Sequence, residues 1–303
     1  MVTISNINNK YLCALEETYG TTPSPFTSVD WGHIQTISIS EDDNVEKNRG
    51  INSGHTASTF EDGLYNCNVS ITTRITKSSL PALMEMCLGD KTDDGTDYTV
   101  VSDNTKSISY SLKTAYTTGK IALINGLSVK DFDLSGAKGD MISLTINCIA
   151  KKASVATEAL SIVTNTSEIF KDLDMSVTIG GDNFILNNFN IAGNWNVTDD
   201  EGRGIEAVSA TERRLIQRVI KHGFDVSGSY EAEIDDNGEM GYTEERSNKA
   251  IVLTISRGAD NEHVFTMANT RSSGRGNELS TENSKRIMSY DYEALDVGLV
   301  GDL

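Results

Sequence analysis

The residues that could perform chemistry are few and scattered. The four histidines, His33, His55, His222 and His263, have neither a second histidine nor a cysteine at the spacing of metal ligands. The chain contains no Gly-x-Ser-x-Gly nucleophile turn and no glycine-rich phosphate loop ending in Gly-Lys-Ser or Gly-Lys-Thr. We therefore expect no catalytic residue and no cofactor, and we do not expect an enzyme.

Two stretches approach known ligand-binding patterns. The GRGNEL stretch from Gly274 contains part of a nucleotide fingerprint, but no βαβ pattern surrounds it, so we expect a hairpin loop. The oxygen-bearing residues Glu233, Asp235 and Asn237, with Glu244 further on, nearly fit a calcium loop. The segment before them alternates as a strand where an entering helix is required. A polar turn is the better interpretation, and we expect no metal site.

Consecutive acidic residues mark two further loops, each of which ends in Arg-Gly-Ile. Acidic residues side by side in a polar loop are usually solvated, so general acid and base chemistry is not expected of them. We instead regard both loops as candidate contact regions. The first carries Glu41, Asp42, Asp43 and Arg49, and the second carries Asp199, Asp200, Glu201 and Arg203.

Composition describes a folded, acidic protein. The chain has 303 residues, 38 % of them hydrophobic, and its formal charge of −18 comes from 44 acids against 26 bases. Such a surface gains no affinity from neutralising phosphates, which disfavours ordinary nucleic-acid binding but permits a surface that repels DNA.

The chain shows no targeting signal that we recognise. No run approaches 18 apolar residues, so no membrane helix is expected, and the first residues have no basic and apolar signal pattern, which favours synthesis in a cytoplasm. Cys13, Cys67, Cys87 and Cys148 lack the spacing of metal ligands and the density of a disulfide scaffold. We expect them to be free thiols, mostly buried.

Short segments with period-two alternation dominate the chain and predict an antiparallel β protein. Clusters of Gly, Asn and Asp separate them, as at 180–183 and 235–238. The fold class that follows is mainly β, with sandwiches or barrels and one or two flanking helices. The predicted strands lie at 36–40, 68–75, 107–113, 141–150, 175–179, 189–197, 224–234, 250–256 and 286–294.

Two segments have helical patterns. Residues 78–89 (SSLPALMEMCLG) have a serine that can cap, a proline in the first turn, an apolar face and a closing glycine. Residues 209–223 (SATERRLIQRVIKHG) have a capping box and apolar residues at helical spacing, but their Ile and Val content also suits a strand. Both alternatives stay open for the second segment.

The two halves of the chain echo one another. Arg49 corresponds to Arg203 in the paired loops, and strands beginning near Asn68 and Asp225 follow them. Later pairs of equivalent residues, such as Asn125 and Asn269, are separated by fewer residues than the earlier pairs. One insertion in the first half, the helix at 78–89, explains this difference. The predicted organisation is an arm at 1–34, a β domain at 35–152, a linker or docking arm at 153–173, a second β domain at 174–295 and a tail at 296–303, which we expect to dock on a neighbouring subunit.

The stretch ETYGTTP from Glu17, followed by Trp31 and an alternating strand, resembles the opening of siphophage major tail tube proteins. In the second half, SVTIGGDNFILNNFNIAGNWNV, a glycine-bearing loop and FDVSGSYEAEI are similar to the C-terminal half of that family. The resemblance covers nearly the whole chain, but it consists of patterns of residue type.

This resemblance implies a structural virion protein with two tube-like β domains. Such proteins assemble into rings that stack into the tube through which DNA leaves the capsid, and members with a duplicated domain are similar in forming trimeric rings with pseudo-sixfold symmetry. The implied partners are further copies of the chain, the tape measure, terminator and distal tail proteins, and DNA in passage. Assembly would take place in the host cytoplasm and the product would be the virion tail. Whether a trimer or a hexamer forms the ring is left open. It is also left open whether the acidic loops at 41–50 and 198–204 reach an adjacent ring or line the lumen.

A duplicated binding module, such as a carbohydrate or receptor adhesin, is the alternative. Such sites present exposed aromatic side chains, whereas Trp31 and Trp195 lie within or beside predicted strands, where core packing is expected.

Overall fold

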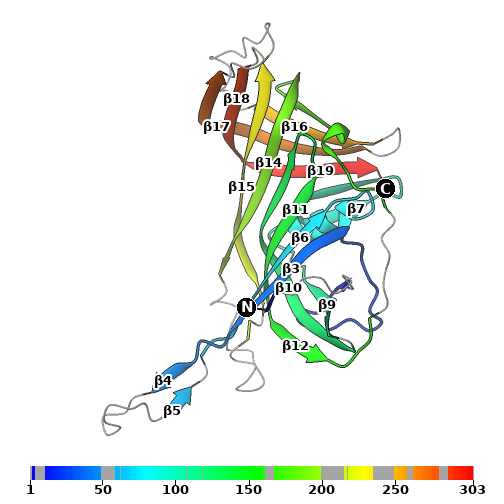
Figure 1. The fold of residues 1–303 in the computed structure, drawn as a ribbon, viewed down its shortest axis with the longest axis vertical. Coiled ribbons are helices and arrows are strands. Elements are labelled where there is room, and N and C mark those ends of the chain that lie inside the picture. The colour runs from blue at the N-terminus through cyan, green and yellow to red at the C-terminus, as the bar shows by residue number, and fades with distance from the viewer. Residues whose placement is uncertain are drawn as a thin grey trace.

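The computed structural model describes residues 2–3, 11–48, 59–61, 63–106, 108–117, 119–160, 167–198, 215–216, 218–234, 249–257, 262–279 and 286–302. Antiparallel strands account for most of them, which confirms the predicted fold class. Each described residue pairing between named strands is antiparallel, and the strands join into one extended system (Figure 1).

A large sheet runs through the molecule. Its strands form where apolar and polar residues alternate, as in β11, where buried Leu144, Ile146 and Cys148 alternate with half-buried Ser143, Thr145 and Asn147. In spatial order the strands are β1 (Val2–Thr3), β3 (His33–Asp42), β6 (Asn66–Arg74), β11 (Ser143–Ala150), the end of β10 (Lys120–Ala137), β14 (Asp182–Thr198), β15 (Ile220–Ile234), β18 (Arg286–Ala294) and the end of β17 (Glu262–Leu279).

Two smaller sheets pair with the other ends of β10 and β17. The first contains β2 (Tyr11–Leu15), β9 (Tyr110–Thr117), the start of β10 and β12 (Lys152–Ala156). The second contains β13 (Met175–Ile179), β16 (Lys249–Ser256), the start of β17, β19 (Asp296–Asp302), β8 (Asp97–Ser102) and β7 (Gly89–Asp93). A separate hairpin of β4 (Glu46–Asn48) and β5 (Thr59–Glu61) projects away from the body (Figure 1). One apolar core unites residues of all three sheets.

The helix α1 (Leu80–Leu88) confirms the stronger helical prediction. Pro81 lies in its first turn, and Gly89 ends it with a φ of 113°, a conformation that glycine adopts without strain. Ser79 does not cap the helix; its hydroxyl accepts a hydrogen bond from the Thr76 backbone N–H instead. Nearly all of α1 is buried against the sheets, and a 3-10 turn, η1 (Asp172–Asp174), precedes β13.

The same order of strand pairing occurs twice along the chain. The first set runs β3, β6, β11, β10, with β9 and β2 continuing from β10 on one side and β12 on the other. The second runs β14, β15, β18, β17, with β16 and β13 continuing from β17 on one side and β19 on the other. We call these the first and second strand sets. In the first set α1 and the β7–β8 hairpin lie between β6 and β9; the matching place in the second set, residues 235–248, lies outside the described residues.

Irregularities in the ladders also occur at equivalent places. A register shift between Ile34 and Thr36 in β3 matches one between Leu186 and Asn188 in β14. Likewise, β10 shifts between Val129 and Asp131 where β17 shifts between Ser272 and Gly274. Because β-bulges are specific features of a fold, their agreement fixes which residues of the two sets correspond.

A third shared irregularity corrects one predicted equivalence. In β10 the register shifts between Ile124 and Leu127, and Gly126 there has a φ of 70°. Asn269, at the matching shift in β17, has a φ of 53°, which asparagine tolerates better than most residues. Asn269 therefore corresponds to Gly126 and not to its neighbour Asn125.

Three other expectations differ from the structure, and the structure decides the alternative left open for 209–223 in the described part of that segment. Residues 220–223, part of the candidate second helix, belong to β15, and Ile216 forms an isolated bridge position; the described part of that segment is thus not helical. The stretch from Gly274 is strand in β17 and not a hairpin loop, because it pairs continuously with β18. Residues expected to begin the linker form β12, and residues expected to form a tail docked on another subunit form β19, which pairs within the same chain. The division into two domains at the stated boundaries stays a prediction.

Lys221 of β15 is a buried amine in the apolar core. Its Nζ lies 4.3 Å from the centroid of the Trp195 ring and has no hydrogen-bond partner among the described residues. Burial lowers the pKa of Lys221 to about 8, although Cys87 and Cys148 nearby oppose the shift. The protein therefore holds a cation at pH 7 in a place that favours the neutral amine.

We expect K221M to raise the free energy of unfolding at pH 7 by about 2 kcal/mol, because the variant no longer buries a charge. The unfolded lysine loses its proton near pH 10.5 and the folded one near pH 8, so the parent gains stability between these values and the advantage of K221M shrinks. Denaturant titrations at pH 7 and pH 10 measure both effects. K120M, which removes an exposed lysine, is the control; equal stability of K221M and the parent at pH 7 would contradict the expectation.

Candidate functional site

The large sheet has one apolar face and one polar face. In β10, buried Phe132 and Leu134 point into the core, whereas Asp131, Asp133 and Ser135 occupy the alternating, half-buried positions. The same alternation holds along β6, β11, β14 and β15, so serine, threonine, asparagine and acidic residues gather on the face away from the core. We call this surface the polar face.

The polar face is acidic. Among the described residues at its alternating positions, the basic ones are Arg74 of β6 and Arg271 of β17, and the exposed Lys130 lies at the bulge of β10 beside Asp131. The surface therefore has no cluster of basic groups that could hold a phosphate chain. The acidic residues at these positions are Asp42, Asp131, Asp133, Asp225, Glu231, Asp291 and Glu293.

Asparagine side chains hold several of these carboxylates. Asn147 Nδ2 donates to Asp131 Oδ1 at 2.6 Å, and Asn190 Nδ2 donates to Asp133 Oδ2 at 2.5 Å. The same contact joins Asn188 to Glu231 at 2.7 Å and Asn196 to Asp225 at 3.1 Å. An amide donor fixes a carboxylate without cancelling its charge. The polar face thus keeps its negative potential while its side chains are held between neighbouring strands.

The two strand sets meet at a single pair of strands in the large sheet, β10 and β14. Their register places Phe132 opposite Gly193 and Gly136 opposite Phe189. The space above each glycine is filled by the phenylalanine: a Cβ on Gly193 would lie 2.3 Å from Phe132 Cε1, and one on Gly136 would lie 2.6 Å from Phe189 Cε1. The junction is thus a reciprocal fit of large and small residues across two strands.

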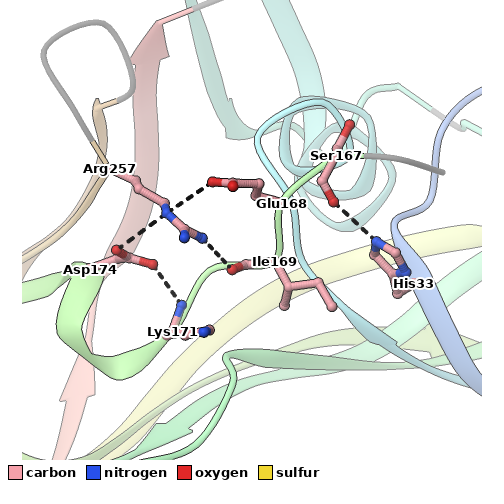
Figure 2. A network of polar contacts seen from close by, with 7 residues as sticks. All are labelled: His33, Ser167, Glu168, Ile169, Lys171, Asp174 and Arg257. Atoms are coloured by element: carbon pink, nitrogen blue, oxygen red, sulfur yellow. Dashed lines mark hydrogen bonds and ion pairs between the residues drawn. The ribbon is translucent and has the colours of Figure 1, made fainter.

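The segment of residues 167–174, between the two strand sets, is held by both of them (Figure 2). From the second set, Arg257 forms an ion pair with Glu168 at 3.2 Å, a longer one with Asp174 at 3.9 Å, and donates to the carbonyl oxygen of Ile169 at 3.0 Å. From the first set, His33 Nε2 lies 3.1 Å from the carbonyl oxygen of Ser167. Isolated bridges join Ile169 to Thr76 and Lys171 to Met141. These contacts fix one set against the other at a second place.

His263 of β17 lies where this segment, β8 and β17 meet. Its ring is fully buried, 5.5 Å from that of Phe170, and Nδ1 lies 2.9 Å from the Tyr98 hydroxyl. Nε2 has no hydrogen-bond partner among the described groups. Burial lowers the pKa of His263 to about 4; Asp302 opposes this shift and Lys77 adds to it. His263 is therefore neutral at pH 7.

We expect the free energy of unfolding to fall as the pH is lowered from about 6.5 to about 4. The unfolded histidine takes up a proton near pH 6.5, whereas the folded one does so only near pH 4, which corresponds to a loss of about 3 kcal/mol. Denaturant titrations across this range measure the loss, and H263Q should remove most of the difference. H222Q, which removes an exposed histidine, is the control. The same pH dependence in H263Q and the parent would exclude His263 as its source.

Some of the candidate contact residues predicted from the sequence lie among the described residues, and the others do not. Glu41 and Asp42 are the last residues of β3 and not part of a loop, and Asp43 follows them. The chain then turns at Asn44, whose φ is 44°, and enters the projecting β4–β5 hairpin. The remaining candidates lie outside the described residues: Arg49, Asp199, Asp200, Glu201 and Arg203.

Sequence reasoning missed the acids of the polar face because it looked for carboxylates in loops. The signal was present as alternation: in KDFDLS, Asp131 and Asp133 flank an apolar residue at strand spacing. Acids that alternate with buried residues in a strand lie on one face and act together, whereas consecutive acids do not.

Several negative findings apply to the described part of the chain. It contains no group of three or more His, Cys, Asp or Glu residues that could hold a metal ion. No helix in it is long and apolar enough to cross a membrane. The four cysteines are free and buried, as predicted. Trp31 and Trp195 are both in the core, so neither offers the exposed aromatic ring that an adhesin would need.

A comparison with protein families finds one whose model covers nearly the whole chain. That family is described as "Phage tail tube protein", and its model matches residues 8–294. No curated protein matches the chain.

Proposed function

The chain belongs to the phage tail tube protein family, and on this basis we propose that copies of it form stacked rings whose shared channel carries DNA out of the capsid. The family makes it a structural component of a virion tail. No enzymatic role is expected of such a component. The ring, its symmetry and the passage of DNA are the parts of the proposal that go further.

The observation that carries the proposal is the polar face of the large sheet. It is broad and acidic, and amide donors hold its carboxylates in place. A channel for DNA must not retain its cargo, and retention depends on lysine and arginine contacts with phosphates. A sheet that turns this face to the channel would repel the DNA backbone along its length.

The edges of the large sheet support closure into a ring. Its first long strand is β3 and its last is β17, and exposed strand edges of this length favour pairing with another chain. A head-to-tail contact between the two different edges closes into a ring when the rotation allows it. Since the chain contains two similar strand sets, we propose three chains per ring, with six sets around the channel.

The β4–β5 hairpin supports contact between rings. It leaves the body beyond the end of β3 and extends away from the sheets (Figure 1). We propose that this hairpin, which follows Glu41, Asp42 and Asp43, reaches an adjacent ring. For the loop carrying Asp199 to Arg203 the same role stays a prediction. Tape measure, terminator and distal tail proteins are the other proposed partners.

Negative-stain electron microscopy of the purified protein, combined with native mass spectrometry, tests the proposal. Hollow rings with six lobes and the mass of three chains, or tubes built from such rings, are the expected result. A protein that stays monomeric over a wide range of salt and protein concentration would contradict self-assembly. Specific glycan binding by such a monomer would favour the adhesin alternative.

A further inference from the structure

The contact that closes the ring can be inferred from the contact inside the chain. We infer that the end of β17 pairs antiparallel with β3 of a second copy, in the register that β10 and β14 adopt within one chain. This inference rests on the proposed function, because it needs copies that join edge to edge. It adds the strands, the register and the residue pairs.

The matching bulges supply the correspondence. Asp131 of β10 and Gly274 of β17 each follow the same register shift, and so do Thr36 of β3 and Asn188 of β14. The end of β17 in the second strand set is therefore equivalent to the end of β10 in the first. In the same way, β3 of the first set is equivalent to β14 of the second. Since β10 already joins β14, the free copies of these two edges are β17 and β3.

Both edges have room for a partner. In the described part of the chain, residues 274–279 of β17 pair with β18 on one side and with no strand on the other. Among the described strands, the free side of β3 pairs only with β1, through Val2 opposite Ile39 and Thr3 opposite Ser38. The β3 edge thus already accepts an added antiparallel strand, and β17 of the neighbour would take the place of β1.

The inferred register places complementary residues opposite one another. The pair Phe132 and Gly193 in the internal junction is equivalent to Arg275 opposite Glu41 of the second copy. Gly136 opposite Phe189 becomes Leu279 opposite Ile37. Oppositely charged and apolar pairs at directly opposed positions stabilise strand pairing. The inferred register thus sets a basic residue opposite an acidic one at one end and two apolar residues opposite each other at the other end.

Other registers lose this match. A shift by one residue brings each strand's core-facing residues to the polar face. A shift by two places Arg275 opposite Ile39 in one direction, or opposite Asp43, beyond the end of β3, in the other. The charges of the two edges therefore favour the register that the internal junction predicts.

Paired cysteines in the full-length protein test the register. S38C with E278C introduces directly opposed positions, whereas the matched control S40C with E278C introduces positions two residues out of register, too far apart for an unstrained disulfide. The four native cysteines are buried and should not interfere. Mild oxidation of assembled S38C/E278C should give disulfide-linked dimers and trimers on non-reducing gels, at least about tenfold more than the control, which corresponds to about 1.4 kcal/mol.

A charge exchange tests the same contact without cysteines. E41R should reduce the fraction of assembled protein several-fold, and E41R/R275E should restore it, with circular dichroism confirming that the fold of each variant is retained. Equal or greater linkage in the S40C control, or no linkage in assembled S38C/E278C, would overturn the register while rings still support the proposed function. If the parent protein forms no rings, the proposed function fails and this inference fails with it.

Discussion

E16L should lower the free energy of unfolding by about 3 to 5 kcal/mol, the largest loss that we expect from any of the single substitutions considered. Glu16 is a buried carboxylate with four donors around it. Oε1 accepts from the Ser111 hydroxyl at 2.6 Å and the Gly126 N–H at 2.9 Å; Oε2 accepts from the Ser109 hydroxyl and the Gly20 N–H, both at 2.7 Å. Leucine would leave the buried Ser109 hydroxyl and Gly126 N–H without this acceptor and would remove the acceptor of the half-buried Gly20 N–H, whereas the Ser111 hydroxyl keeps Asn125 Oδ1 at 3.1 Å.

E16Q distinguishes lost acceptors from lost volume. Glutamine has nearly the shape of glutamate but turns an NH₂ group toward donors, so an intermediate loss of about 1 to 2 kcal/mol is expected. E17Q, at an exposed neighbouring position, should change stability by less than about 0.5 kcal/mol. Denaturant titrations of the three variants give the ranking. A loss in E16L no larger than that in E17Q would show that these contacts add nothing to stability.

G228A should cost about 3 kcal/mol or more, because β15 has no room for a methyl group at this position. A Cβ there would lie 2.2 Å from the backbone oxygen of Asn190 and 2.4 Å from the hydroxyl oxygen of Tyr292. That hydroxyl already donates to the same Asn190 oxygen at 3.0 Å. The added carbon would therefore have to displace both the neighbouring strand and a buried tyrosine.

G298A is the matched control for G228A. Gly298 also lies in a strand, but the nearest atom to an added Cβ is the Val100 oxygen at 3.8 Å, an ordinary contact distance. Thermal and denaturant unfolding of the two variants should therefore differ by most of the expected loss. Similar stabilities would mean that the large sheet adjusts easily around Gly228.

Strands with strict alternation were predictable from the sequence. The predictions for 175–179 and 286–294 coincide with β13 and β18 because each strand has one buried and one exposed face. The same reasoning missed β10. Its first part is buried at adjacent residues such as Ile121 and Ala122, and it bends at Gly126 to join a second sheet, so no single period describes it.

Strands defined by distant partners were not predictable in this way. Residues 97–102 form β8, which pairs locally with β7 but on its other edge with β19 from the far end of the chain, and a local pattern carries no information about that second partner. The hydrogen bonds that hold the acids of the polar face were not predictable for a related reason. Asp131 comes close to Asn147 only through strand pairing, and loop acids such as Asp199 drew attention instead.

The pairing of β8, which follows the first strand set in the chain, with β19 of the second set has a consequence for synthesis on the ribosome. The β7–β8 hairpin is made with the first set, yet it completes its pairing on β19, after every other described strand has been made. A growing chain would hold the exposed edge of β8 until translation reaches that point. Chains cut short before β19 would carry an unsatisfied strand edge, which quality control in the host could recognise before a defective subunit entered a tail.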